Sequence, residues 1–230
     1  MNEPLIECRK LRLGYGTNSV VAEVDLQIPR GILLPFIGVN GAGKTTLFNT
    51  LLGLLKPLGG TLIRNFGSWP PGYVPQLKNI DSIYPVSVRQ LVCMGFYPEN
   101  GPFKKLQPGQ IERLEGTLMH FGLLEHQRKT FAELSGGLKQ KTLIARAFVG
   151  CSEVIFLDEP VAGLDAASED DLLNLIRTLN QEQKKSILLA HHRLEDLSRL
   201  ADTVCLIENR KALMLPASGV WKSAHGLKKG

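Results

Sequence analysis

A glycine-rich segment of the 230-residue chain has the residue types and spacing of a nucleotide phosphate site. The run GVNGAGKTT fits the pattern GxxxxGK[ST]. Its glycines let successive backbone N–H groups curl around phosphates, and a helix opening at Lys44 would point its positive end at the same place. Lys44 can reach the β- and γ-phosphates, while Thr45 offers a hydroxyl to Mg²⁺. The residues expected to contact ATP here are Gly38, Val39, Asn40, Gly41, Ala42, Gly43, Lys44, Thr45 and Thr46.

An acidic pair follows the apolar run VIFL, at Asp158 and Glu159. A carboxylate at the carboxyl end of a buried strand lies at the edge where open α/β sheets bind ligands. Asp158 is suited to hold Mg²⁺ directly or through water, and Glu159 is the natural general base for an attacking water. Alone, the pair would be read as a solvated acidic turn. Beside the phosphate loop it indicates a nucleoside triphosphatase.

A second anion site is predicted at Leu134-Ser135-Gly136-Gly137, just before a helix expected over 136–148. Ser135 is a good N-cap residue, and the following helix start presents free backbone amides. The chain therefore carries two separate helix N-termini of the kind that bind phosphate.

The surrounding pattern is that of an α/β protein. Apolar runs at 32–37, 153–157 and 186–190 are typical of parallel strands buried on both faces. Further strands are expected at 5–13, 20–28, 61–64, 72–75 and 203–208. Helices are expected at 44–54, 87–96, 109–121, 136–148, 167–181 and 193–200. We predict one domain over 1–230: a mainly parallel core sheet, an antiparallel edge subdomain, a helical lobe inserted at about 78–150, and a loose tail at 216–230.

Over about residues 5–215 the chain resembles the ATP-binding cassette (ABC) ATPases, whose signature motif LSGG stands here upstream of the acidic pair. The resemblance implies the ABC ATPase version of the P-loop fold and ATP hydrolysis coupled to transport through a separate membrane permease. It also implies a dimer, with itself or a sister ATPase. Ser135, Gly136 and Gly137 of one subunit would cap the γ-phosphate held by Gly38–Thr46 of the other.

The same resemblance gives roles to four more positions. Tyr15 is similar to the aromatic residue that stacks on adenine, and Gln76 to the glutamine that touches Mg²⁺ and the attacking water. His192 resembles the histidine that contacts the γ-phosphate, and Gly163-Leu164-Asp165 the loop at the dimer interface. Each has a plainer interpretation, such as a turn tyrosine, a loop glutamine or a structural histidine. Their shared order favours the functional one.

The chain departs from the family pattern at Leu138, Val39, Arg193 and Val161. Leu138 replaces the usual glutamine of the signature and loses a polar contact across the dimer, while Arg193 alters the charge beside His192. We hypothesise weaker or slower nucleotide-driven dimerisation than in a closer match. An ATPase assay of Leu138→Gln tests this, because no gain in rate or dimerisation would count against it.

One segment bears on the transported solute. The residues from Gly72 to Tyr97 are similar to a segment of ABC importers for zinc, manganese and related metals, although Phe96 stands in place of an arginine. The pair His191-His192 also resembles that subfamily. We expect an exposed apolar patch in this lobe to dock the permease, and Tyr84→Ala to uncouple transport while sparing basal ATPase activity. The patch is predicted to comprise Ile83, Tyr84, Met94, Phe96 and Tyr97.

Composition bears on the partners and the cellular location that we expect for the chain. The net charge of +5 is spread without a run of like charges, which favours a solvated basic surface over a nucleic-acid partner. The four cysteines form no CxxC pair, so reduced and mostly buried thiols are expected. No signal peptide and no apolar stretch of membrane-spanning length are visible. We therefore expect a peripheral protein on the cytoplasmic face of the membrane, held there by its permease and assisted in some systems by a periplasmic or surface solute-binding protein.

Rival functions remain open at this point. An ABC ATPase for another solute, imported or exported, fits the same motifs. ABC-type ATPases outside transport usually carry two cassettes or a long coiled-coil insertion, and this chain has neither. A P-loop metabolic kinase would leave Leu134–Gly137 without a purpose.

Overall fold

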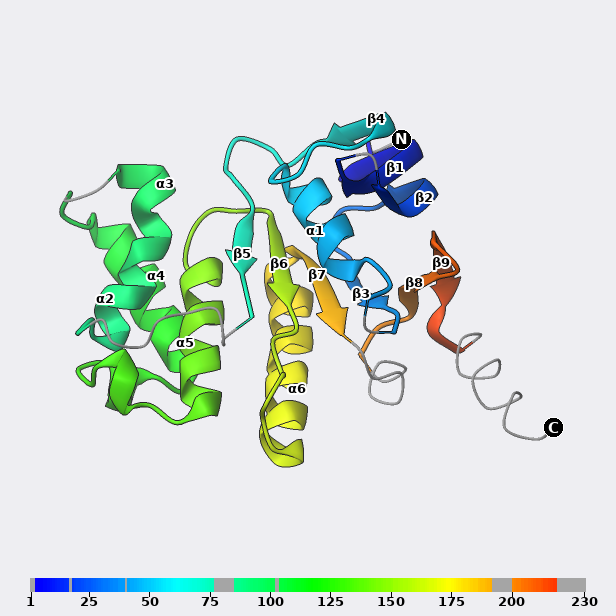
Figure 1. Cartoon of the computed structure of the whole chain (residues 1–230). Coiled ribbons are helices and arrows are strands. Elements are labelled where there is room, and N and C mark those ends of the chain that lie inside the picture. Colours follow the sequence, from blue (N-terminus) through cyan, green and yellow to red (C-terminus); the bar gives the residue numbers. More distant parts are fainter. Residues whose placement is uncertain are drawn as a thin grey trace. The chain divides into compact units, whose positions relative to one another are not determined.

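The computed structural model describes residues 3–16, 18–39, 41–76, 85–101, 104–191 and 200–218 (Figure 1). The chain divides into two compact units. The first combines Met1–Phe66 with Arg177–Gly230, and the second is Gly67–Ile176.

The first unit contains an antiparallel sheet in the order β2-β1-β4, built from β1 (Ile6–Tyr15), β2 (Asn18–Ile28) and β4 (Gly59–Arg64). Alternating apolar residues of β1, such as Leu11 and Leu13, are fully buried, as expected for a sheet with one face on the core. The sheet confirms the predicted antiparallel subdomain.

The other sheet strands of this unit are β7 (Ser186–His191), β3 (Leu33–Ile37), β8 (Thr203–Glu208) and β9 (Lys211–Pro216). β3 pairs in parallel with both β7 and β8, and β9 pairs antiparallel to β8. Every residue of β3 and β7 is buried, which confirms the prediction of strands covered on both faces. Because β3 and β8 are parallel, their carboxyl ends meet at one edge.

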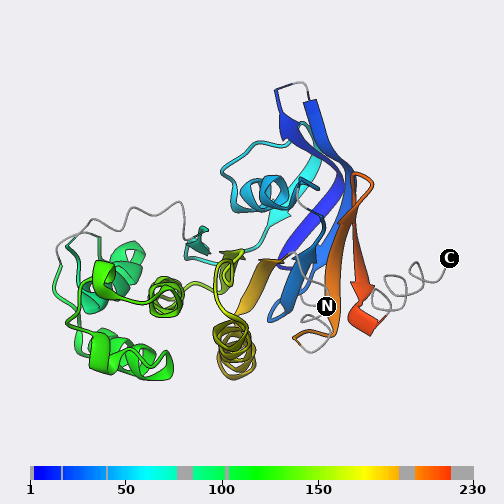
Figure 2. The ribbon, with the colours of Figure 1, turned by 60° about the horizontal axis from the view of Figure 1, so that its bottom comes forward.

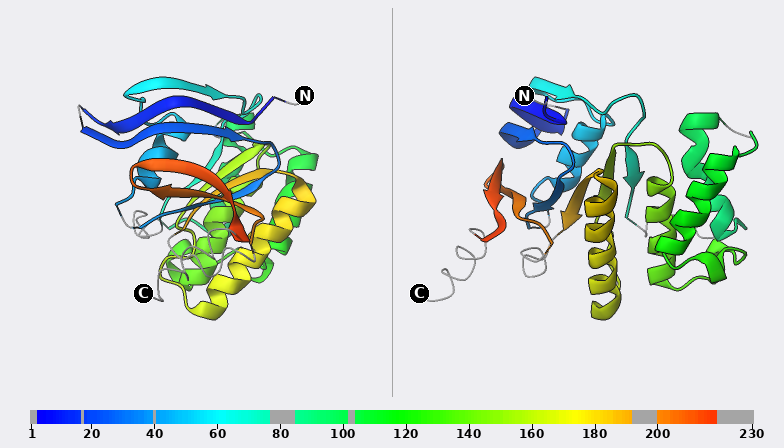
Figure 3. Two further views of the ribbon diagram at one scale, coloured as in Figure 1. Left: turned by 90° about the vertical axis from the view of Figure 1, so that its right-hand side faces the viewer. Right: turned by 180° about the vertical axis from the view of Figure 1, so that it is seen from behind.

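Helix α1 (Lys44–Leu52) covers β3, and the Phe48 ring meets the Phe36 ring edge-on with centroids 5.0 Å apart. Beyond β8, the strand β9 runs beside β2, as Figure 2 and the left view of Figure 3 show. No strand was predicted after 208, and the predicted tail begins inside β9, at Pro216. Ala217 also donates its N–H to the Asp202 carbonyl at 2.9 Å, so the expected loose tail is wrong at its first two residues.

The second unit pairs β5 (Gly72–Val74) in parallel with β6 (Val154–Asp158). Its helices are α2 (Val88–Cys93), α3 (Tyr97–Asn100), α4 (Pro108–His120) and α5 (Gly136–Phe148), with short 3₁₀ turns at Met94–Phe96 (η2), Leu124–His126 (η3) and Phe131–Glu133 (η4). Helix α6 (Ala166–Gln183) begins here and ends in the first unit.

Two prolines of the second unit stand in the first turn of a helix, where a residue needs no N–H partner. Pro98 and Pro108 both occupy such positions. The core between α4 and α5 includes the Phe121 and Phe148 rings, whose centroids are 5.8 Å apart. The helix predicted at 193–200 lies outside the described residues, apart from Leu200. Among the helices described, none combines the length and apolar character required to cross a bilayer.

Candidate nucleotide site

The loop after β3 has the backbone of a phosphate cradle. Gly41 and Gly43 have φ angles of 83° and 101°, in the left-handed region that favours glycine. A Cβ on Gly43 would also lie 2.4 Å from the Cγ2 atom of Val21, so the position leaves no room for a side chain. Gly43 caps α1, whose first turn contains no acidic residue. No acidic side chain of this turn therefore competes with a bound anion for the positive end of the helix.

Lys44 lies along this loop and is only 6% exposed. Its Nζ atom donates hydrogen bonds to the carbonyl oxygens of Gly38, at 2.7 Å, and Val39, at 3.2 Å. Thr45 is exposed at the start of α1, whereas Thr46 is buried. Of the residues predicted to bind phosphate, Asn40 lies outside the described residues. The loop holds a cation and a hydroxyl where a polyphosphate and its metal would bind.

Tyr15 ends β1, is 54% exposed, and pairs with Asn18 at the start of β2. An exposed ring at a strand end can stack on a base.

In the second unit, the acidic pair stands at the carboxyl edge of its strands. Asp158 ends β6 and is 5% exposed. Burial of Tyr73, and to a smaller extent the charge of Asp158, raises the pKa of Tyr73. Val74 pairs with Leu157, so Gln76 and Asp158 leave β5 and β6 at the same edge. The predicted metal-binding residues of this unit are thus brought together.

Glu159 has a φ of 48°, although it is not a glycine. Non-glycine residues in this region are uncommon and concentrate at functional sites. Its carbonyl oxygen accepts the N–H of Ala162 at 3.1 Å, which closes a tight turn directly after the strand. The backbone therefore leaves the direction of the buried strand at Glu159.

The signature segment begins α5 as predicted. The Ser135 Oγ atom accepts the N–H of Leu138 at 3.4 Å, and Ser135 and Gly136 are exposed. A Cβ on Gly136 would lie 3.8 Å from the Cδ2 atom of Leu164. The segment Gly163-Leu164-Asp165 therefore lies against the start of α5.

Asp165 fixes the beginning of α6. It accepts hydrogen bonds from the Ser168 N–H at 3.0 Å and the Ser168 hydroxyl at 2.7 Å, and these bonds lower its pKa. A Cβ on Gly137 would lie 3.8 Å from the same hydroxyl oxygen. The two loops of this unit that the sequence assigned to a dimer interface are neighbours.

Several predicted residues are not placed. His192, Arg193, Ile83 and Tyr84 lie outside the described residues. His191, which precedes His192, ends β7 and is fully buried.

The predicted docking patch needs one correction. Phe96 is 1% exposed, and the guanidinium of Arg113 from α4 lies 5.1 Å from its ring centroid. Phe96 is therefore a core residue and cannot belong to an exposed patch. Tyr97 is 49% exposed, and Met94 is half-buried.

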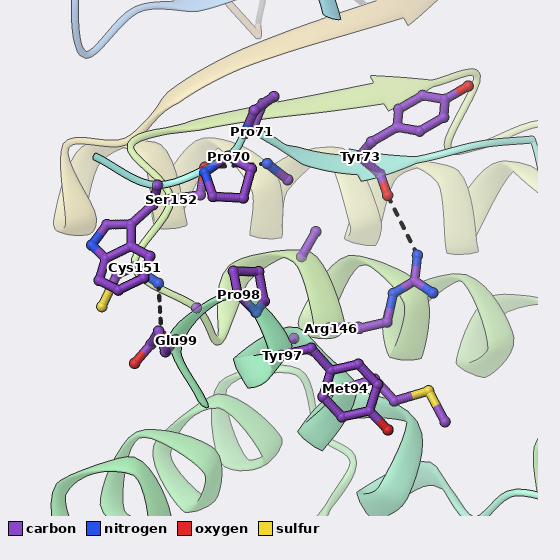
Figure 4. Close-up of a pocket in the computed structure, with 15 residues that line it drawn as sticks. Pro70, Pro71, Tyr73, Met94, Tyr97, Pro98, Glu99, Arg146, Cys151 and Ser152 are labelled. Atoms are coloured by element: carbon purple, nitrogen blue, oxygen red, sulfur yellow. Dashed lines mark hydrogen bonds between the residues drawn. The ribbon is translucent and has the colours of Figure 1, made fainter. Parts of the chain in front are cut away.

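A groove of about 320 Å³ in the second unit was not anticipated (Figure 4). Trp69, Met94, Tyr97 and Arg146 are among the residues that line it. Arg146 donates to the Tyr73 carbonyl at 3.4 Å across one side. The predicted docking patch included Met94 and Tyr97, which line this groove. No pattern in the sequence indicates that Trp69 lies near them.

Glu99 and Arg113 tie the walls of this groove together. Arg113 donates to the Glu99 carboxylate at 2.5 Å and to the Cys151 sulfur at 2.7 Å, and the Cys151 N–H donates to Glu99 at 3.1 Å. Although burial opposes ionisation, hydrogen bonds from Arg113 and Gln110 lower the pKa of Glu99. No local motif signals this network, because its members are far apart in the sequence.

A family model described as "ABC transporter" matches residues 21–162. The manganese transport system ATP-binding protein MntB of Bacillus subtilis is 32% identical over 94% of this chain and 88% of its own length. The zinc transport system ATP-binding protein TroB of Treponema pallidum is 35% identical over 89% of this chain and 79% of its own.

Other relatives have different solutes. The petrobactin import ATP-binding protein FpuD of Bacillus anthracis is 30% identical over 90% of this chain and 78% of its own. Among solved structures, a chain of an ABC transporter assigned to the metal-chelate type, in an inward-facing conformation, superposes with a TM-score of 0.84. That chain is 27% identical, over 95% of this chain and 85% of its own.

Proposed function

Because this chain belongs to the ABC transporter family, we propose that it powers the import of a divalent metal ion, zinc or manganese, through a separate membrane permease. It is an ATP-binding subunit of an ABC transporter, an ATPase coupled to transport. The observation that carries the choice of solute is the similarity to manganese and zinc transport subunits along almost the whole chain. Import of another solute is the second candidate: the petrobactin import protein FpuD and the solved transporter of the metal-chelate type support it.

ATP hydrolysis requires groups that hold the phosphates and activate water. Lys44 and the loop amides would hold the phosphates, and Glu159 would accept the proton of the attacking water. The exposed hydroxyl of Thr45 in one unit, and the Asp158 carboxylate and Gln76 amide in the other, are oxygen donors of the kind Mg²⁺ prefers. When bound, Mg²⁺ supplies positive charge that neutralises the phosphates. His192 is proposed to contact the γ-phosphate.

Two such chains, or this chain and a sister subunit, would complete each ATP site between them. The exposed Ser135 and Gly136 supply a second set of helix-start amides, suited to a γ-phosphate presented by the partner. Leu164 lies beside Gly136, so a partner that contacts Gly136 would approach Leu164 as well.

The permease is proposed to dock in the groove shown in Figure 4. The exposed Tyr97 and Trp69 and the half-buried Met94 form an apolar-aromatic lining, which suits the apolar face of a short helix. Such docking would hold the chain at the cytoplasmic face of the membrane.

The docking proposal is tested with Tyr97→Ala in the assembled transporter. The side chain is half-exposed and lies away from the phosphate loop in sequence, so basal ATP hydrolysis by the free chain should persist. Metal uptake and permease-stimulated hydrolysis should fall about 10-fold or more, as for loss of an aromatic anchor. Met119→Ala, at an exposed apolar residue of α4 outside the groove, is the control. Equal uptake in Tyr97→Ala and Met119→Ala would contradict the docking site.

The choice of solute is tested by uptake in cells that express this chain together with its permease. Accumulation of labelled Mn²⁺ or Zn²⁺ should depend on the chain and vanish in Glu159→Gln. Uptake of an iron chelate with no free-metal uptake would instead select the second candidate.

A further inference from the structure

A hollow of about 480 Å³ in the first unit lies between the phosphate loop and the turn that joins β8 to β9. Its volume falls within the roughly 300–1,000 Å³ typical of small-molecule sites. Gly38, Val39 and Gly41 line one side, Glu208 and Arg210 the other, and Val20 of β2 contributes between them. A molecule in this hollow would touch the same loop that binds phosphate.

The hollow arises because β8 runs parallel to β3. Ile37 pairs with Leu206, so the residues after each strand leave the sheet side by side. A Cβ on Gly38 would lie 2.6 Å from the carbonyl oxygen of Ile207, which shows how closely the two segments approach. The β8–β9 turn therefore extends along the flank of the phosphate loop.

The strand β2 links Tyr15 to the hollow along the chain, because Asn18 pairs with Tyr15 and Val20 lines the hollow. β2 starts opposite Tyr15 and reaches the loop within a few residues, since a Cβ on Gly43 would contact the side chains of both Val20 and Val21. A nucleotide held by its phosphates must project its ribose and base to one side of the loop. The hollow lies on the side of the loop that Val20 of β2 reaches.

We propose that the ribose and base of ATP occupy this hollow, and that Arg210 positions them. The inference rests on ATP binding by the phosphate loop and adds a residue that the family motifs do not include.

The backbone of the turn supports a role for the Arg210 side chain. Glu208 pairs with Lys211, and the two residues between them, Asn209 and Arg210, have φ angles of 49° and 62°. A two-residue hairpin turn with both φ angles positive favours Asn-Gly. Glycine at 210 would therefore fit the backbone of this turn better than arginine. The arginine side chain instead offers five hydrogen-bond donors and a planar group that stacks on aromatic rings.

The test is the binding of two ligands to the full-length chain and its Arg210→Gly variant. Glycine suits the observed φ, so the turn should form without the side chain. The dissociation constant for ATP should rise about 5- to 30-fold, as for loss of a charged hydrogen-bond partner. Binding of inorganic tripolyphosphate, which lacks ribose and base, should stay within about 2-fold of the unmodified chain.

Lys211→Ala is the matched control, because Lys211 is exposed on the same turn but does not line the hollow. It should bind both ligands like the unmodified chain. Unchanged ATP affinity in Arg210→Gly would overturn the proposal, and so would an equal loss for ATP and tripolyphosphate, which would make Arg210 a phosphate contact. Failure of the unmodified chain to bind either ligand would instead overturn the ATP site itself.

Discussion

The Nζ atom of Lys44 lies 2.7 Å from the carbonyl oxygen of Gly38, so the side chain spans the phosphate loop from the helix back to its first residue. A buried ammonium needs such partners, because its charge is costly to remove from water. Triphosphate oxygens can replace these carbonyls as stronger, charged acceptors.

Replacement of Lys44 by alanine should therefore abolish measurable ATP binding, with a dissociation constant raised by about 100-fold or more. Isothermal titration of the purified chain measures this. Lys56→Ala, at an exposed lysine shortly after α1, serves as the control and should bind like the unmodified chain. Retention of ATP binding by Lys44→Ala would show that the loop does not hold the nucleotide.

The Glu159 carboxylate is proposed to act only in the chemical step. Glu159→Gln should lower the ATPase rate by about 10²- to 10⁴-fold while ATP affinity changes little, as for loss of a general base. Phosphate release and equilibrium binding, measured on the same sample, separate the two effects. Glu182→Gln, at an exposed residue near the end of α6, should leave both unchanged. A variant that binds ATP normally and still hydrolyses it at half the rate or faster would remove Glu159 from this role.

The Glu99–Arg113 pair should stabilise the second unit in a pH-dependent way. Hydrogen bonds hold the folded-state pKa of Glu99 below its ordinary value of 4.5, so its contribution is complete above that pH and is lost as the pH falls through the lowered pKa. Glu99→Gln should cost roughly 1–2 kcal/mol at pH 7, and the difference should shrink below pH 4.5.

Urea denaturation at several pH values measures this difference. Glu112→Gln, at an exposed residue of α4, is the control and should change stability by less than about 0.5 kcal/mol. A Glu99→Gln deficit that stays constant from pH 7 to pH 3 would mean that the carboxylate charge plays no part.

The features that could be predicted from the sequence are those that a few consecutive residues determine. The loop Gly38–Thr46, the acidic pair and the Ser135 cap each depend on a few consecutive residues, and each is found at the strand end or helix start expected for it. The buried strands β3, β6 and β7 could be predicted for the same reason, since uninterrupted apolar runs have few other uses in a protein of this composition.

The features that sequence missed depend on packing between distant segments. Phe96 was predicted to be exposed beside Tyr97, but it is buried in the packing between its own turn and the helices of the unit, with Arg113 of α4 5.1 Å from its ring centroid. β9 carries Leu213 on its solvent side, 53% exposed, so its pattern was too weak to distinguish from a tail. The hollow beside Arg210 exists only because β8 and β3 end together.

The most direct test of the central claim, that two chains grip one ATP, is a crosslink between differently tagged copies carrying Val39→Cys and Ser135→Cys. Both positions are exposed. Burial raises the pKa of the Cys8 and Cys205 thiols, which keeps them unreactive, and Cys93→Ala and Cys151→Ser remove the other two. In a Glu159→Gln background, a short thiol crosslinker should join the two tags only when ATP is present. No ATP-dependent product, or an equal yield without nucleotide, would contradict an ATP site shared between two copies of this chain.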